Sequence, residues 1–449
     1  MERLHASYAP WPLTSQQKAY WVLHERDNRW NHFDIFALLV SGWLDLDALN
    51  MSVETLISRH DALRTRITMI DGAPHQFVEP PRRYGVRIDP LAEVTEDPAD
   101  SRVKAQLAVE ELDRQEPDVA VAPLFSVRAI KLSDQEHVLV WIIHHLIFDL
   151  ESLNLMFRDF WALYSECLSG TPPSLANVPF QYSDYGAWQR KAIGPLDSAH
   201  ADGWRSRLDG ATGIEWPGEE AMQPIAQGTV EYFEISLPEE LREGLREVAR
   251  RIPTLLSLLM LTIYIGAVAR WCGQSDFVVA TMATGRDRRE HHSVVGLLSH
   301  PIYLRIKLAG NETPLDLLRR VNGEFYRAVL HSDFGETVTG SFGLLRGSLF
   351  TWIPWRAEDV FGVPRPDESA RAGVRVERFQ FAQRPTFPEH LNIEVLLSDT
   401  PTIAGGVIYR SNAFERSTID RFVEEMHDIA ERMVNAPDSR IPTNGAVSS

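Results

Sequence analysis

The stretch that decides the fold of this chain reads Trp141-Ile142-Ile143-His144-His145-Leu146-Ile147-Phe148-Asp149. The apolar run over 138–143 is typical of a β-strand that is buried on both faces. A strand that ends in two histidines carries a titratable ring from the core to an edge or a cavity. Histidine has the ordinary pKa nearest to neutrality, so it is the most frequent general base. Asp149 opens a helical pattern, where it is expected to cap the helix or hold an ion pair.

Strands and helices alternate outward from this stretch. A strand is expected over 125–132, before the apolar run, and a strongly periodic helix over 153–168, after it. Another helix is expected over 47–60, with Asp47 as its cap. The most membrane-like segment, 255–269, is shorter than the ~20 residues that a membrane span needs, so we expect a buried core helix there. This alternation indicates an α/β or mixed α+β protein.

The polar, helix-breaking segment Gly170-Thr171-Pro172-Pro173-Ser174 divides the chain. It predicts an N-terminal domain over 1–175 and a C-terminal domain over 176–449.

Composition narrows the choice of partners. The chain has 449 residues and a net charge of −17, which argues against nucleic acid or an anionic membrane as the main partner. Arg82-Arg83 with Arg87, and the run 286–289, are expected to be solvated surface groups. The two cysteines lack paired spacing, which argues against a disulfide framework or a metal site. The N-terminus has no hydrophobic signal core, so we expect a cytoplasmic protein.

The two histidines alone do not decide between a structural and a catalytic role. A second pair, His291-His292, has no aspartate at the same spacing, so such pairs arise without a motif. Other segments favour catalysis. They are Pro12–Gln17 with Tyr20-Trp21, Ser58–Thr65, Tyr182–Trp188, Gly285-Arg286, Val295-Gly296 with Arg305, and Tyr409 with Phe414. With His144-His145-x-x-x-Asp149, in this order, the chain resembles the condensation domains of nonribosomal peptide synthetases. Those domains belong to the chloramphenicol-acetyltransferase-like superfamily.

The resemblance implies a fold and a reaction. The fold is two chloramphenicol-acetyltransferase-like lobes in a V around a central tunnel, with His145 near its middle. The reaction transfers an acyl chain from the 4′-phosphopantetheine thioester of a carrier protein to an amine or a hydroxyl. An amide or an ester forms, as in nonribosomal peptide, polyketide or antibiotic biosynthesis. The enzyme itself is expected to bind no cofactor.

The resemblance also suggests residue roles. His145 is the expected general base or nucleophile-positioning group, and His144 is expected to have a structural role beside it. Asp149 is expected to form a structural ion pair with Arg286, with Arg64 as the second choice of partner.

Two departures from the family pattern point to an unusual substrate. Leu150 stands where the family has glycine, and Ser299-His300-Pro301 stand where it has Val-Asn-Thr. Leu150, Ser299 and His300 are therefore expected to line the tunnel or bind substrate.

The resemblance implies partners as well. We expect a free-standing monomer that meets an acyl or peptidyl carrier protein in trans and passes the chain to a small amine or alcohol, which would release it. One alternative is an acyl-CoA-dependent acyltransferase of the same superfamily. Others are a non-catalytic module that recruits carrier proteins, and an epimerisation domain.

Overall fold

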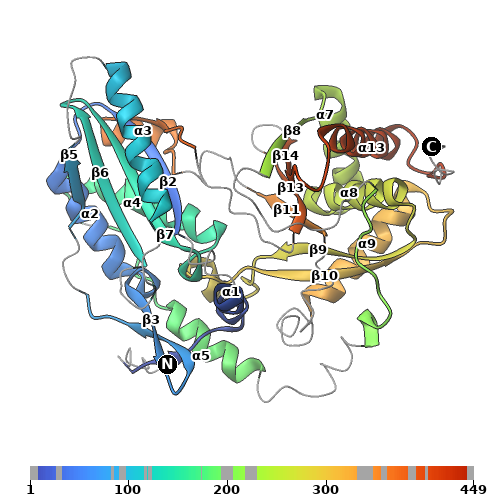
Figure 1. Cartoon of the computed structure of the whole chain (residues 1–449), viewed down its shortest axis with the longest axis horizontal. Coiled ribbons are helices and arrows are strands. Elements are labelled where there is room, and N and C mark those ends of the chain that lie inside the picture. The colour runs from blue at the N-terminus through green and yellow to red at the C-terminus, as the bar shows by residue number, and fades with distance from the viewer. Residues whose placement is uncertain are drawn as a thin grey trace. The chain divides into compact units, whose positions relative to one another are not determined.

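The computed structural model describes residues 9–26, 33–81, 85–90, 98–115, 119, 124–172, 174–193, 206–217, 230–330, 347–354, 362–382, 391–399 and 403–441. The chain forms two compact units, each discontinuous in sequence (Figure 1). The first unit comprises Met1–Gly194, Thr284–Ser299 and Ala357–Arg384. The second unit comprises Pro195–Ala283, His300–Arg356 and Pro385–Ser449.

A five-stranded sheet forms the centre of the first unit. Its strand order is β12 (Arg375–Arg378), β2 (Phe33–Ser41), β7 (Glu136–His144), β6 (Phe125–Ser133) and β5 (Arg87–Pro90). All neighbours are antiparallel except β5 and β6. Strand β7 is the central strand and is buried from its second residue onward, as its apolar sequence predicts. Its last residue, His144, lies opposite Phe33 of β2.

Helix α4 (Leu150–Leu168) packs against α2 (Leu46–Arg59) and α12 (Pro366–Ala372), whereas α3 (Pro98–Arg114) packs against β2 and β6. Trp141 of β7 joins the sheet to α4, because its ring makes edge contacts with Phe157 and Phe160 at centroid distances of 5.0 and 4.8 Å. The buried aromatic cluster holds the end of β7 and the start of α4 in place, and with them the link between the two elements.

The cap predicted for α2 is wrong by two residues. Asp45, not Asp47, is the N-cap, and its side chain accepts a hydrogen bond of 2.8 Å from the Ala48 amide. The reason is that a capping residue needs an extended backbone, which Asp45 has, while Asp47 already lies in the first helical turn.

The remaining elements of the first unit surround the end of β7. They are β1 (Trp11–Pro12), α1 (Ser15–Arg26), η2 (Asp61–Arg64), β3 (Thr65–Ile70), β4 (Ala73–Val78), η3 (His145–Ile147), α5 (Tyr182–Ile193) and η4 (Arg289–Ser293). Strands β1, β4 and β3 form a small antiparallel sheet. Helix α5 belongs to the first unit. The division after residue 175 assigned this helix to the C-terminal domain, and as a domain boundary it stays a prediction.

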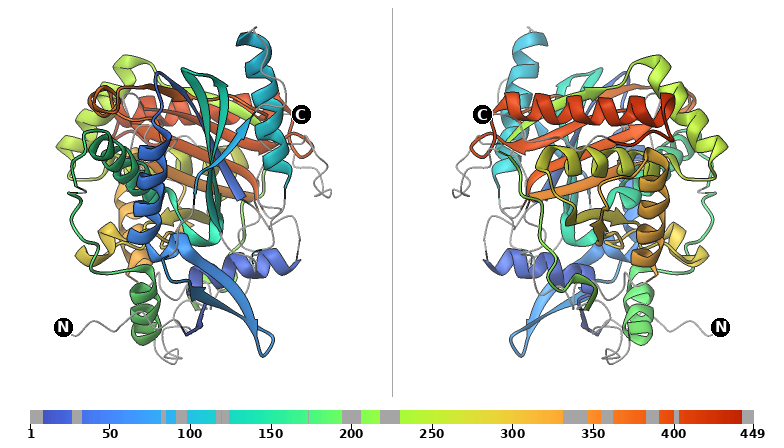
Figure 2. Two further views of the ribbon diagram at one scale, coloured as in Figure 1. Left: turned by 90° about the vertical axis from the view of Figure 1, so that its left-hand side faces the viewer. Right: turned by 90° about the vertical axis from the view of Figure 1, so that its right-hand side faces the viewer.

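The second unit contains a six-stranded mixed sheet. Its order is β10 (His300–Lys307), β9 (Asp276–Ala283), β11 (Gly347–Ile353), β13 (Leu391–Asp399), β14 (Ile403–Arg410) and β8 (Val230–Ser236). Figure 2 (right) shows α13 (Arg416–Asn435), α8 (Leu256–Cys272) and α9 (Pro314–Val329) side by side. Helix α8 is buried on all sides from Leu258 to Val268 and forms the centre of the core, as the sequence predicted.

In the part of the chain that the structure describes, no single helix is long and apolar enough to cross a membrane. Helix α7 (Glu239–Arg251) reaches that length only together with α8, and the two helices meet at an angle of 114°. The mixed α/β class expected from the sequence is confirmed.

Candidate active site

The link between β7 and α4 is a single turn in which each polar side chain has a defined place. His144 ends β7, and its Nδ1 accepts a hydrogen bond of 3.1 Å from the backbone amide of Leu146. The His144 ring is buried, and its face meets Phe33 in an edge contact at 4.9 Å. Because Nδ1 accepts this bond, the proton of a neutral His144 lies on Nε2. His144 therefore closes the turn that follows the strand.

His145 lies at the start of η3 with its ring between two aromatic side chains. The ring stacks on Phe148 at 5.0 Å and meets Tyr20 of α1 at 4.6 Å. Its Nε2 lies 3.3 Å from the Tyr20 hydroxyl. Its Nδ1 is buried and has no hydrogen-bond partner among the residues that the structure describes. The residue as a whole is half-buried. Because Nδ1 is buried, Nε2 is the candidate nitrogen for proton transfer.

Asp149 caps α4 with a carboxylate whose two oxygens are fully used. Oδ1 accepts hydrogen bonds from the amide and hydroxyl of Ser152 at 2.9 and 2.7 Å and from Arg286 Nη2 at 2.9 Å. Oδ2 accepts from Arg286 Nη1 at 2.7 Å and from the amides of Leu298 and Ser299 at 3.0 and 2.9 Å. Burial alone would raise the pKa of Asp149, but the Arg286 charge and these hydrogen bonds together lower it.

Arg286 is buried, and its guanidinium contacts the Asp149 carboxylate and backbone carbonyl oxygens. It forms a bidentate pair with Asp149 and also donates to the carbonyl oxygens of Thr284 and Val294, each at 3.1 Å. The expectation of a solvated group at 286 is therefore wrong, since an arginine that reaches an internal carboxylate is held inside the unit. Arg64, the second choice of partner, instead donates to the carbonyl oxygen of Glu79 at 2.5 Å. Arg82 and Arg83 lie outside the described residues.

The segment 284–299, which carries Arg286, is fastened to α4 and α5. The Ser152 hydroxyl donates to the Gly296 carbonyl at 2.8 Å and accepts from the Gly296 amide at 3.0 Å. His291 is buried among three aromatic rings, those of Phe180, Tyr185 and Trp188. Sequence reasoning assigned no role to Ser152. Its position three residues after Asp149, where a cap receives its hydrogen bond, was a signal that could have identified it.

The other predicted site residues lie in both units. Leu150 is the first residue of α4 and is half-buried, and Ser299 donates its backbone amide to Asp149. His300 belongs to the second unit, where it begins β10 opposite Ala283 and is buried. The first unit thus brings together His144, His145, Asp149, Leu150, Arg286 and Ser299. The roles of Leu150, Ser299 and His300 in lining a tunnel or binding substrate stay predictions.

The matched segment 58–65 also forms a buried polar cluster. Arg59 Nε donates to Asp159 Oδ2 at 2.9 Å, and His60 Nε2 lies 3.6 Å from the same oxygen. Burial alone would raise the pKa of Asp159, but the neighbouring His60 and Arg158 side chains lower that pKa to about 2. Burial lowers the pKa of His60, so this ring is neutral at pH 7. These contacts join the end of α2 to α4 and have a structural role.

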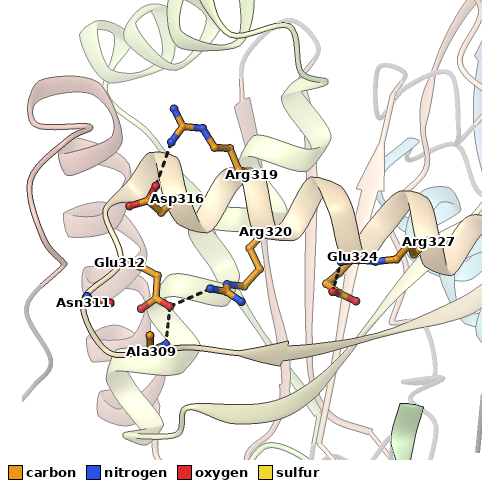
Figure 3. Close-up of a pocket in the computed structure, with 8 residues that line it drawn as sticks. All are labelled: Ala309, Asn311, Glu312, Asp316, Arg319, Arg320, Glu324 and Arg327. Carbon is orange, nitrogen blue, oxygen red and sulfur yellow. Dashed lines mark hydrogen bonds and ion pairs between the residues drawn. The ribbon is translucent and has the colours of Figure 1, made fainter. Parts of the chain in front are cut away.

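A separate polar hollow lies in the second unit along α9 (Figure 3). It has a volume of about 510 Å³ and is lined by Ala309, Asn311, Glu312, Asp316, Arg319, Arg320, Glu324 and Arg327. Its charges pair with one another, as Arg319 does with Asp316 at 3.1 Å and Arg320 with Glu312 at 3.4 Å. None of the predicted site residues lines it. Among the described residues no group of His, Cys, Asp and Glu side chains has metal-binding geometry.

Similarity to known proteins identifies the family of this chain. A model of the condensation domain matches residues 9–342, and the chain is therefore a member of the condensation domain family. The isonitrile lipopeptide synthase of Mycobacterium tuberculosis is 26% identical over 97% of this chain, which spans 18% of the length of that synthase.

Solved structures share the fold at low identity. The X-domain from teicoplanin biosynthesis has a TM-score of 0.78 at 20% identity, with 97% of each chain covered. The first condensation domain of the CDA synthetase has a TM-score of 0.71 at 19% identity, with 97% of this chain and 98% of that chain covered. The expected chloramphenicol-acetyltransferase-like fold is confirmed by these similarities.

Proposed function

We propose that this chain is an acyltransferase that moves an acyl chain from the 4′-phosphopantetheine thioester of a carrier protein to an amine or hydroxyl acceptor. Membership of the condensation family supports amide-forming condensation in peptide or polyketide biosynthesis. The observation that carries the proposal is the position of His145. His145 follows the end of a buried strand and is half-buried, and its buried Nδ1 leaves Nε2 as the candidate base.

The proposed reaction needs one proton acceptor at this place. The acceptor nitrogen or oxygen attacks the thioester carbonyl carbon and gives up its proton to His145 Nε2. The carbon–sulfur bond then breaks, and the leaving thiolate takes that proton to become the free thiol. A base whose pKa lies near the working pH contributes about 10²–10⁴-fold to such a step.

Asp149 has a different part in this proposal. Both of its oxygens are occupied by Arg286, Ser152 and backbone amides, and its pKa is lowered despite its burial. A carboxylate with a lowered pKa and no spare oxygen is a poor proton acceptor. Asp149 holds segment 284–299 against the start of α4, and its loss would reduce activity through the structure.

The test follows an acylated carrier protein by intact-protein mass spectrometry in the presence of a panel of amines and alcohols. The native chain should remove the acyl mass and form a product with one class of acceptor. His145→Gln should lower the rate by about 10²–10⁴-fold with an unchanged circular dichroism spectrum. His75→Gln, at a half-buried histidine of strand β4, is the matched control. Equal rates in the His145→Gln and native proteins would exclude His145 as the base.

Leu150 supports a proposal about the acceptor. It replaces the family's glycine at the first position of α4, one residue after the cap. A leucine side chain there occupies space that glycine leaves open. We propose that it selects for small acceptors, and a Leu150→Gly variant should accept bulkier members of the panel. An unchanged acceptor range would remove this role.

A second candidate is a module that binds partners without catalysis. The fold similarity to the teicoplanin X-domain favours testing it, because that domain has a solved complex with OxyB. In this case the acyl mass would stay on the carrier in every reaction of the panel. The chain would still bind a carrier protein or a partner enzyme, which calorimetry would detect.

A further inference from the structure

We propose that Tyr20 is the positioning residue of His145. Its hydroxyl donates a hydrogen bond to Nε2, which keeps the ring proton on Nδ1 and leaves Nε2 as the basic nitrogen. This inference deepens the proposed function and rests on it for its catalytic consequence.

Tyr20 makes the only polar contact of the His145 ring among the described residues. Nε2 lies 3.3 Å from the Tyr20 hydroxyl, while Nδ1 is buried without a hydrogen-bond partner in that part of the chain. The other neighbours are ring faces, Phe148 at 5.0 Å and Tyr20 itself at 4.6 Å. Aromatic contacts fix the plane of an imidazole but do not choose its tautomer. That choice belongs to the hydrogen bond.

The neighbouring carboxylate of Asp149 is not available to orient His145. A catalytic histidine is usually oriented by a third group that bonds one ring nitrogen. The Asp149 oxygens are taken by Arg286, by Ser152 and by the amides of segment 284–299. Tyr20 is then the described side chain that can orient His145.

The direction of the hydrogen bond between Tyr20 and His145 follows from the chemistry of the two groups. A neutral imidazole has one donor and one acceptor nitrogen, and a phenol can serve as either partner. The imidazole nitrogen is the more basic atom, and the phenol is the more acidic group. The stronger arrangement therefore has the Tyr20 hydroxyl donating to Nε2. An entering acceptor would take the place of the hydroxyl at the Nε2 lone pair, which is unprotonated in this tautomer.

Helix α1 holds Tyr20 in place beside His145. Gln17 and Tyr20 are three residues apart, so they share one face of the helix. Gln17 is fully buried, and its Nε2 donates to the Leu146 carbonyl oxygen at 2.9 Å. Gln76 donates in turn to Gln17 Oε1 at 2.6 Å. Helix α1 is thus bound to the residue that follows His145, and this fixes the reach of the Tyr20 side chain.

The test measures the ring nitrogens of His145 directly. With ¹⁵N-labelled histidine, the signals of His145 are those lost in His145→Gln. In the native protein near pH 8 they should show a protonated Nδ1 and a bare Nε2. In Tyr20→Phe, which keeps the ring contact, they should show a mixture of tautomers. The variant should also lower kcat by about three- to tenfold with KM changed less than about twofold, as the loss of one hydrogen bond predicts.

Tyr164→Phe is the matched control. Its hydroxyl accepts a hydrogen bond of 3.0 Å from the Asp45 amide in the same unit, and Tyr164 does not contact His145. This control removes one buried hydroxyl and should leave the His145 tautomer, the kcat and its pH profile as in the native protein.

Two results would overturn the inference. One is a native protein in which Nε2 of His145 carries the proton, and this decides the matter even if Tyr20→Phe fails to fold. The other is a Tyr20→Phe variant with the native tautomer and pH profile. A shifted tautomer in a chain that transfers no acyl group would support Tyr20 as the positioning residue and refute the proposed function alone.

Discussion

Asp149 illustrates how a buried charge is stabilised when hydrogen bonds occupy both of its carboxylate oxygens. Each of its oxygens accepts three hydrogen bonds, and the bidentate Arg286 supplies one to each. A buried carboxylate is tolerated when a counter-charge and hydrogen bonds replace its hydration. The pair therefore costs little while it is complete, and its removal exposes the full desolvation penalty of the remaining partner.

Arg286→Met should destabilise the protein by about 3–5 kcal/mol, because it leaves Asp149 as an uncompensated buried charge. Urea denaturation followed by tryptophan fluorescence measures the loss. The control is Glu377→Gln, which breaks the exposed pair of Glu377 with Arg375 and should change stability by less than about 0.5 kcal/mol. Equal effects of the two variants would contradict the structural role of the Asp149–Arg286 pair.

The same carboxylate predicts a pH dependence. The pKa of Asp149 is lowered in the folded state, so its contribution is fully present above the ordinary aspartate pKa of about 3.9. The contribution is lost as the pH falls through the lowered pKa. The stability difference between the native protein and Asp149→Asn should therefore be constant from pH 6 to 5 and shrink below about pH 4. A difference that does not change with acid would be inconsistent with the lowered pKa.

At the scale of elements, segment 284–299 completes the site of the first unit. Gly285 has φ +64°, and a Cβ atom there would collide with the backbone oxygen of Leu298. The turn therefore needs glycine for two reasons, its left-handed backbone and its close approach. Because Arg286 is the next residue, this turn decides whether the guanidinium reaches Asp149.

Gly285→Ala and Gly273→Ala separate the two reasons. Both glycines have φ +64°, but a Cβ atom at Gly273 meets nothing within 4 Å. Gly273→Ala should cost only the strain of left-handed backbone, about 1–2 kcal/mol. Gly285→Ala should cost clearly more and should also lower acyl transfer, because Arg286 moves. Thermal unfolding and the carrier assay measure both effects, and equal costs at the two positions would argue against the close contact.

At the scale of the whole molecule, the chain consists of two α/β units and belongs to the condensation domain family. The net charge of −17 would repel a carrier protein that is itself acidic. Recognition of such a carrier would therefore depend on local contacts. The partner itself, the monomeric state and the cytoplasmic location remain proposals. A single assay can decide whether the acyl donor is a carrier protein or coenzyme A.

The same acyl group should be transferred more efficiently from a carrier protein than from coenzyme A. Both donors share the phosphopantetheine thioester, so any preference measures docking of the carrier. Each 1.4 kcal/mol of docking free energy should raise kcat/KM by about tenfold. Single-turnover mass spectrometry with both donors provides the comparison. Efficient turnover from acyl-coenzyme A alone would identify an acyl-CoA-dependent acyltransferase.

The sequence alone determined the local features of this protein. The apolar run of β7, the buried helix α8 and the cap of α4 by Asp149 all follow from residues a few positions apart. The periodicity of apolar residues and the capping of a helix depend on residues a few positions apart. Both can therefore be predicted directly from the sequence. Even here the choice between Asp45 and Asp47 needed the backbone conformation of the helix start.

Only the tertiary structure decided which distant groups meet. Arg286 lies 137 residues from Asp149, and Tyr20 lies 125 residues from His145. The resemblance suggested the first pair with Arg64 as its rival, and nothing in the sequence pointed to the second. Side chains so far apart meet only when the folded chain brings their elements together, and the spacing of residues does not contain that information. The sequence therefore identified His145, whereas the folded first unit shows that Tyr20 contacts it and that Asp149 is committed to Arg286.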